Sequence, residues 1–495
     1  MVGLCATASA AQEPLSAIDW LSNSTFEVLA PPDPPVLGVF TRPVETHPLD
    51  ELGIDGVGLI SAADAGLPPD LWGASQSAEI AALLASEPQE LLPAARDLLK
   101  RILLAELNPP RDASSNSGFL VARVDRLLAL GALNEAEILL ENTGTATPDL
   151  FRRRFDVALL TGDEVAACRE LDQQPNIFPT HSARIFCLAR SGDWSAAALT
   201  LESANALGIL DPDEDALLLR FLDPGLADEL EPLTPPLRPS PLKFRLFEAI
   251  GEPLPTGTLP LAFAHADLRP QNGWKGRIEA AERLVRAGAI DANLLFGLYT
   301  RGRPSASGGV WERVGAIQSL EDALADEGNS LAQSAAIEVA WTQMALAGLE
   351  IAFVDLYANQ IGEMDLEGPG REIARRMVLL NGSKGVRLTP GTNPRERFEL
   401  ALAENRPSSA PATDPLGRAV QLGLSLAPVV PSGLTSYTST DRRGEALLRT
   451  IDALSGQGAG DLDDITNALL FLRYLSLEES AKSVALELIL LRDSS

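Results

Sequence analysis

The 495-residue chain is poor in basic residues, with 40 lysines and arginines against 68 acidic residues. Its formal net charge is −28 at pH 7. Such a surface repels nucleic-acid phosphates and anionic lipid head groups, so we expect neither as a partner. A basic partner or a cationic solute suits the charge, although solubility alone also explains it.

Other absences narrow the class of fold. Aromatic residues make up only 5% of the chain, no alternating run of β-branched and aromatic residues predicts a sheet, and no apolar run is long enough to span a bilayer. Alanine and leucine dominate, and both enter helices at little entropic cost. The composition therefore predicts an all-α protein without a membrane span.

The sequence also lacks a complete catalytic or ligand-binding motif. Its three histidines, His47, His181 and His265, are scattered, so no Ser-His-Asp set or metal site is indicated. Residues 211–215 resemble half a calcium loop but lack the glycine and the final glutamate, and Ser240 is better explained as a helix N-cap. We expect no catalytic residues, no cofactor and no metal.

The clearest positive signal lies in residues 119–210, where a glycine-ended helix is followed three times by a helix with a small residue five positions on. The pairs are Gly131 with Ala136, Gly162 with Ala167, and Gly192 with Ala197. These segments resemble the turns of tetratricopeptide (TPR) repeats, although their spacings of 31 and 30 residues are shorter than the usual 34. Generic helical hairpins also end at glycine and remain the alternative.

The resemblance implies an α-solenoid of stacked helical hairpins, preceded by an irregular, proline-rich N-terminal arm. The sequence divides into a signal remnant (1–11), the arm (12–74), a TPR-like helical domain (75–231), a proline-rich linker (232–241), a central helical-hairpin domain (242–386) and a C-terminal helical domain with a capping hairpin (387–495). In the last hairpin, Ser476 stands where the earlier ones have glycine.

The N-terminus is typical of the end of a secretory signal peptide. Residues 8–10 read Ala-Ser-Ala, which fits a cleavage site, whereas the basic segment and most of the apolar segment are missing. We therefore expect a start codon further upstream and export to a bacterial periplasm. A disordered tail on a cytoplasmic protein is the alternative.

Cleavage of this signal leaves two cysteines, Cys168 and Cys187. An even pair in an oxidising compartment, placed on helices adjacent in sequence, predicts a disulfide. Two buried free thiols remain the alternative.

Two further features are candidate contacts for a partner. Trp311 follows the small-residue loop 305–309, and tryptophan often anchors interfaces, although a core position is the simpler explanation. Arg152, Arg153 and Arg154 form a basic cluster that suits an acidic partner or pairing with nearby carboxylates.

Helical stacks usually bind proteins or peptides on their extended surfaces. By this analogy the sequence predicts an exported, non-enzymatic scaffold or adaptor in the bacterial envelope. An accessory factor or enzyme of peptidoglycan metabolism is the alternative function.

Overall fold

The computed structural model describes residues 53–86, 90–113, 117–144, 147–174, 177, 180–225, 232–304, 307–326, 328–382, 393–455 and 461–491. Helices form nearly all of the regular secondary structure of these residues, which confirms the all-α prediction. The expected signal remnant at residues 1–11, and the arm as far as residue 52, lie outside the described ranges.

The helices follow one another along the chain. The first half contains α2 (Ser77–Ser86), α3 (Pro93–Leu104), α4 (Gly118–Ala129), α5 (Leu133–Glu141), α6 (Pro148–Thr161), α7 (Glu164–Gln173), α8 (His181–Arg190), α9 (Trp194–Ala206), α10 (Pro212–Leu222), α11 (Pro241–Ala249) and α12 (Ala264–Asp267). The second half contains α13 (Trp274–Arg286), α14 (Ala292–Tyr299), α15 (Val310–Ala325), α16 (Ser330–Leu346), α17 (Glu350–Gly362), α18 (Gly368–Asn381), α19 (Pro394–Ala403), α20 (Pro415–Ser425), α21 (Thr435–Ser439), α22 (Arg443–Ala453), α23 (Leu462–Tyr474) and α24 (Glu478–Leu490). Strands β1 (Ile60–Ser61) and β2 (Ala105–Glu106) pair in parallel over two residues.

Five helices begin with the same signal, a capping side chain followed by proline. The cap accepts a hydrogen bond from the backbone N–H three residues on, and the proline ring fixes the φ angle that the first helical residue needs. The pairs are Thr147–Pro148, Asp211–Pro212, Ser240–Pro241, Asn393–Pro394 and Asp414–Pro415. The expectation that Ser240 is an N-cap is thereby confirmed.

The glycines of residues 119–210 end their helices in the left-handed conformation. Gly131, Gly162 and Gly192 have φ angles of +73°, +94° and +91°. Ser476, which replaces glycine in the last hairpin, also has a left-handed φ of +61°. The turn geometry is therefore that expected for glycine-ended hairpins.

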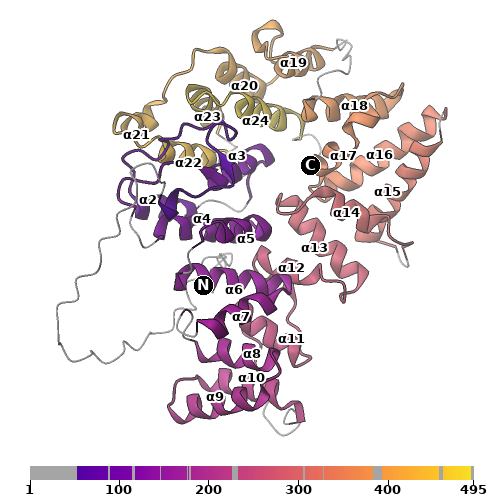
Figure 1. Cartoon of the computed structure of the whole chain (residues 1–495). Helices are drawn as coiled ribbons and strands as arrows, with labels where there is room; N and C mark the ends of the chain where they lie inside the picture. Colours follow the sequence, from indigo (N-terminus) through magenta and orange to yellow (C-terminus); the bar gives the residue numbers. More distant parts are fainter. Residues whose placement is uncertain are drawn as a thin grey trace, which may run out of the picture.

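Consecutive helices pack against each other over most of the chain. This order is interrupted at α11, which also packs against the earlier helix α6. From α4 to α10 each helix contacts the next or the next but one, and α11 and α12 then pack back onto α6 (Figure 1). Helices α13 to α18 continue as a second group on the right-hand side of the view.

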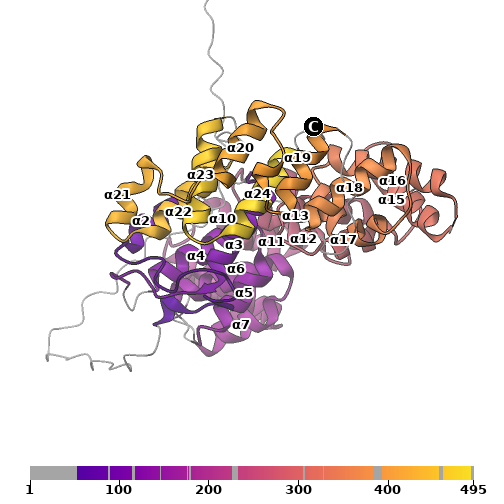
Figure 2. The same ribbon diagram turned by 90° about the horizontal axis from the view of Figure 1, so that it is seen from above.

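The C-terminal helices return to the N-terminal ones. Helix α24 packs against α3, α18 and α19, and α22 packs against α2 and α3. Figures 1 and 2 show these yellow and indigo helices side by side in both views. Segments from opposite ends of the described chain therefore share one packed unit.

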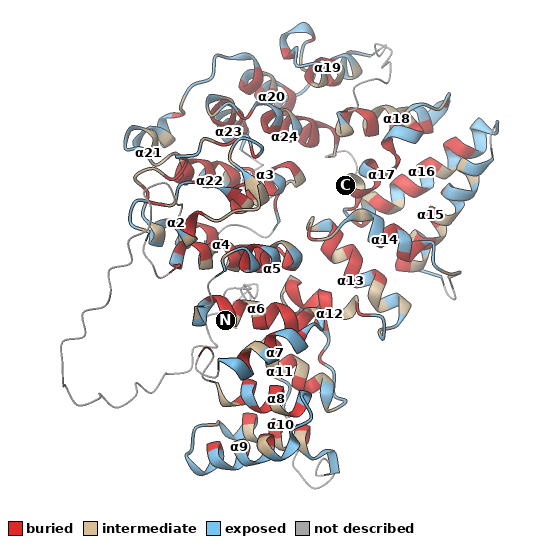
Figure 3. Cartoon of the chain, in the orientation of Figure 1, coloured by how far each residue is buried: buried red, intermediate tan, exposed pale blue. Residues whose placement is uncertain are grey.

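The buried side chains form two main hydrophobic clusters. The larger cluster joins residues from α2 to α11 with residues from α18 to α24, and the second lies within α13 to α18 (Figure 3). Phe244 and Phe247 of α11 belong to the larger cluster, so its core continues across residues 232–241. The division into domains stays a prediction.

Helix α3 connects several otherwise separate segments through its polar side chains and its N-terminus. Its Ala94 N–H donates to Glu487 Oε2 of α24 at 2.9 Å. Its Arg96 Nη1 donates to the Arg286 carbonyl at the end of α13 at 2.5 Å. Lys100 Nζ donates to the Gly288 carbonyl at 2.9 Å. One helix thus satisfies backbone groups at the end of α13 while receiving its own N-terminal cap from α24.

The glycine turns after α13 and α16 lie in contact with arginine side chains that donate hydrogen bonds to carbonyl groups at the same helix ends. A Cβ on Gly288 would approach Arg96 Nε to 2.9 Å, and one on Gly348 would approach Arg286 Nε to 3.3 Å. Arg286 Nε also donates to the Ala347 carbonyl at 2.6 Å. At these two positions glycine provides both the left-handed φ angle and the space that the guanidinium occupies.

The carboxyl group of Glu487 is buried where α24 meets α3. Burial raises its pKa to about 8, while the hydrogen bond from Ala94 N–H opposes the rise. The charge of Asp97 raises the pKa further, Arg96 lowers it, and Asp355 adds a smaller increase. Glu487 is therefore protonated in the folded protein at neutral pH and still accepts the hydrogen bond from α3.

Glu487 makes folding stability depend on pH. Between pH 4.5, the ordinary value for glutamate, and about 8, the unfolded chain releases this proton while the folded chain keeps it. Stability therefore falls as pH rises through this window, by up to about 5 kcal/mol. Glu487→Gln should remove this component and be more stable than wild type at pH 8, as measured by urea unfolding from pH 5 to 9.

The matched control is Glu479→Gln, an exposed position on the same helix. It should leave the pH profile unchanged. A Glu487→Gln profile that parallels wild type would contradict the assignment of the buried proton.

Candidate functional site

The two groups of predicted contact residues occupy different parts of the fold. Trp311 is half-buried at the start of α15, with its ring centroid 4.9 Å from that of Trp274. Trp274 Nε1–H in turn donates to the Leu298 carbonyl at 2.8 Å. Trp311 thus packs at the edge of the second hydrophobic cluster, and its contact with a partner stays a prediction.

The three consecutive arginines on α6 face carboxylates. Arg153 is buried and makes two hydrogen bonds to Asp125, at 2.8 and 2.9 Å. Arg154 forms an ion pair with Glu170. The structure therefore shows Arg153 and Arg154 in intramolecular pairing, and contact of the cluster with a partner stays a prediction.

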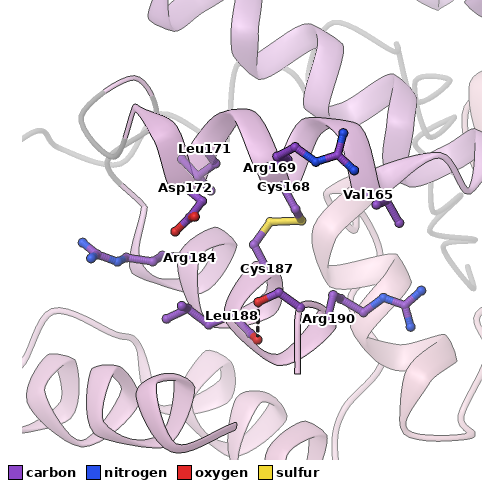
Figure 4. Close-up of a pocket in the computed structure, with 10 residues that line it drawn as sticks. Val165, Cys168, Arg169, Leu171, Asp172, Arg184, Cys187, Leu188 and Arg190 are labelled. Carbon is purple, nitrogen blue, oxygen red and sulfur yellow. Dashed lines mark hydrogen bonds between the residues drawn. A yellow bond between two sulfur atoms is a disulfide. The ribbon is translucent and has the colours of Figure 1, made fainter. Parts of the chain in front are cut away.

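The structure joins Cys168 of α7 to Cys187 of α8 in a disulfide, with Cα atoms 5.1 Å apart. The bridge lies in the wall of a pocket of about 280 Å³ between the two helices (Figure 4). Figure 4 shows the sulfur–sulfur bond at the centre of the side chains that line the pocket. The disulfide is therefore part of a candidate binding site as well as a cross-link.

The pocket combines apolar and cationic side chains. Its ten lining residues are Val165, Cys168, Arg169, Leu171, Asp172, Arg184, Cys187, Leu188, Arg190 and Ser191. Six of these residues are exposed, so the pocket opens to solvent. They are Val165, Arg169, Asp172, Arg184, Arg190 and Ser191. An apolar floor with charged groups at its margin is typical of a site for a small molecule or a side chain.

One of the three arginines is held by a buried glutamate. Arg190 Nη2 donates to Glu164 Oε1 at 2.8 Å, and Arg245 Nη2 of α11 donates to the same oxygen at 2.9 Å. Glu164 is only 1% exposed, and its charge is balanced by these two cations. The rim of the pocket is thereby fixed to α11.

The other two arginines have no such anchor. Among the described residues, no hydrogen bond or ion pair involves the guanidinium group of Arg169 or Arg184. Both residues are exposed. The sequence reasoning missed them, although their positions next to Cys168 and one helical turn before Cys187 were a usable signal.

A second candidate surface lies on helix α16. Ile337, Trp341 and Met344 point into the second hydrophobic cluster. On the opposite face Leu331, Val339 and Leu346 are 82%, 54% and 76% exposed, and Glu338 is the charged residue among them. An apolar stripe along the exposed side of a helix is a mark of protein interaction.

Other classes of site find no support in the described ranges. No three His, Cys, Asp or Glu side chains lie close enough there to hold a metal ion. None of the helices described combines the length and apolar character needed to cross a membrane.

Comparison with known proteins gives no match, whether against family models, curated proteins or solved structures.

The disulfide closes a loop with a sequence separation of 19 residues. Loop-closure entropy for this length predicts a stabilisation of about 3 kcal/mol, because the cross-link restricts the unfolded chain. The double variant Cys168→Ala/Cys187→Ala should lose this amount in urea unfolding without reductant.

Reductant provides the control for this prediction. Dithiothreitol should destabilise wild type by a similar amount and leave the double variant unchanged. Equal stability of oxidised wild type and the double variant would contradict a stabilising cross-link.

Proposed function

We propose that the chain is an exported, non-enzymatic, TPR-like α-solenoid that acts as a scaffold or adaptor for a protein or peptide in the bacterial envelope. The observation that carries the proposal is the exposed apolar stripe of α16. A disulfide suits an exported protein, because cytosolic thiols are usually kept reduced. Stacked helical hairpins supply extended binding surfaces, which is an argument from architecture.

The charge around α16 specifies the chemistry of the partner. Glu338 is exposed on α16, and Asp322 is exposed on the neighbouring helix α15. The net charge of the whole chain is −28. A segment with an apolar face flanked by lysine or arginine would bury the stripe and pair with these carboxylates.

A charged substitution in the stripe tests this proposal. Val339→Glu should weaken partner binding at least about tenfold, because it places a carboxylate in the apolar contact beside Glu338. Stability should change little, since Val339 is 54% exposed. The measurement is photo-cross-linking from position 331 in intact cells, with mass spectrometry of the products.

Leu422→Glu is the matched control, because Leu422 is 50% exposed on the distant helix α20. This variant should give the wild-type cross-link. The proposal fails if no specific partner is captured, or if Val339→Glu cross-links as well as wild type. Turnover of purified peptidoglycan would instead favour the cell-wall alternative.

A further inference from the structure

The pocket between α7 and α8 brings a disulfide within reach of solvent molecules. Cys168 and Cys187 both line it, and exposed side chains form most of its margin. A disulfide enclosed by the core would react with a dissolved thiol only after unfolding. Cys168 and Cys187 belong to the edge of the core, with 8% and 7% of their surface exposed, but both also line a cavity of about 280 Å³ from which a small organic thiol can approach them.

The charge of the pocket is opposite to that of the protein. Three arginines and Asp172 line the pocket, and because Glu164 pairs with Arg190, the positive charge available to a reagent comes from Arg169 and Arg184. The chain as a whole carries −28. In Figure 4 Arg169 and Arg190 lie on one side of the disulfide with Val165 between them, and Arg184 lies on the other side near Asp172, with its guanidinium group directed outward.

We propose that this pocket is a site of thiol–disulfide exchange that selects small anionic thiols. The arginines attract the anionic reagent, and the apolar residues Leu171 and Leu188 accommodate its carbon chain. The same cations stabilise the negative charge that passes onto the departing sulfur. The inference concerns this pocket alone and does not depend on a partner of α16.

The reaction proceeds in two balanced steps. The thiolate of the reagent attacks one cysteine sulfur, the Cys168–Cys187 bond breaks, and its electron pair leaves on the other cysteine as a thiolate. This gives a mixed disulfide between the protein and the reagent. A second reagent thiolate then attacks the sulfur of the bound reagent, which releases a small-molecule disulfide and the second cysteine thiolate. Two reagent thiols are oxidised and one protein disulfide is reduced.

The dependence of the reaction rate on the charge of the thiol distinguishes a local effect of this pocket from the effect of the whole protein's charge. Long-range attraction by the −28 chain would make a cationic thiol react faster than an anionic one. Local interaction with unpaired guanidinium groups at several ångströms reverses this order by about three- to tenfold. Because salt screens charges beyond about 8–10 Å, moderate ionic strength weakens the long-range effect more than the local one.

The experiment compares three thiols on the folded, full-length protein. The probes are 2-mercaptoethanesulfonate (anionic), 2-mercaptoethanol (neutral) and cysteamine (cationic) at equal thiolate concentration. Each rate is divided by the rate of the same thiol with bis(2-hydroxyethyl) disulfide, which removes intrinsic differences in nucleophilicity. Alkylation of the released cysteines followed by mass spectrometry measures the extent of reduction.

We expect the anionic thiol to react with wild type at least about threefold faster than the cationic thiol, in normalised rate. Arg169→Gln/Arg184→Gln should abolish or invert this preference. Arg418→Gln, at an exposed arginine on α20, is the control and should keep the wild-type ratio. The proposal is overturned if cysteamine is the faster reagent, if the double variant keeps the wild-type ratio, or if reduction is independent of thiol concentration and therefore limited by unfolding.

Discussion

The arrangement of this protein depends on side-chain donors that satisfy the carbonyl groups at helix C-termini. An α-helix leaves its last carbonyls without intrahelical partners, and the end carries a partial negative charge. Here carbonyls at helix C-caps, or one residue beyond them, receive hydrogen bonds from segments far away in sequence. His265 bonds the Gly131 carbonyl at 2.7 Å, Lys100 the Gly288 carbonyl at 2.9 Å, and Arg286 the Ala347 carbonyl at 2.6 Å.

These contacts link groups of helices that share few neighbours. Lys100 connects the N-terminal helices to α13, and Arg286 connects α13 to α16. Burial lowers the pKa of His265, although its hydrogen bond to Gly131 acts in the opposite direction, so a neutral imidazole holds the end of α4. The caps therefore place one group of hairpins against the next with a direction that apolar packing alone does not specify.

Local features of the fold were accessible from the sequence, whereas its closure was not. The glycines at 131, 162 and 192 and the N-cap Ser240 act through neighbouring residues, so their patterns predict helix ends directly. The hydrogen bond between Ala94 and Glu487 joins residues 393 positions apart in the sequence. From the sequence alone, a glutamate on a helix is expected to face solvent. Only tertiary packing shows that its carboxyl group is buried.

The candidate sites show the same limit. Spacing alone indicated the pair Cys168 and Cys187, because a cross-link between adjacent helices is a local matter. The cationic pocket beside the bridge depends on which arginines find partners. Arg153 forms an ion pair with Asp125, whereas the guanidinium group of Arg169 has no partner among the described residues. The sequence alone does not distinguish these two arginines. Likewise, the apolar residues of the α16 stripe are expected from the sequence to be buried, and only the packing of the neighbouring helices shows that they are exposed.

The meeting of α24 with α3 has a consequence for biosynthesis. Ribosomes make the α3 segment long before the α24 segment, so Leu98 and Leu99 of the nascent chain lack part of their final packing until synthesis is nearly complete. Contacts of such high sequence separation also slow the search for the native state. The contact between α3 and α24 therefore forms only after the α24 segment has been synthesised.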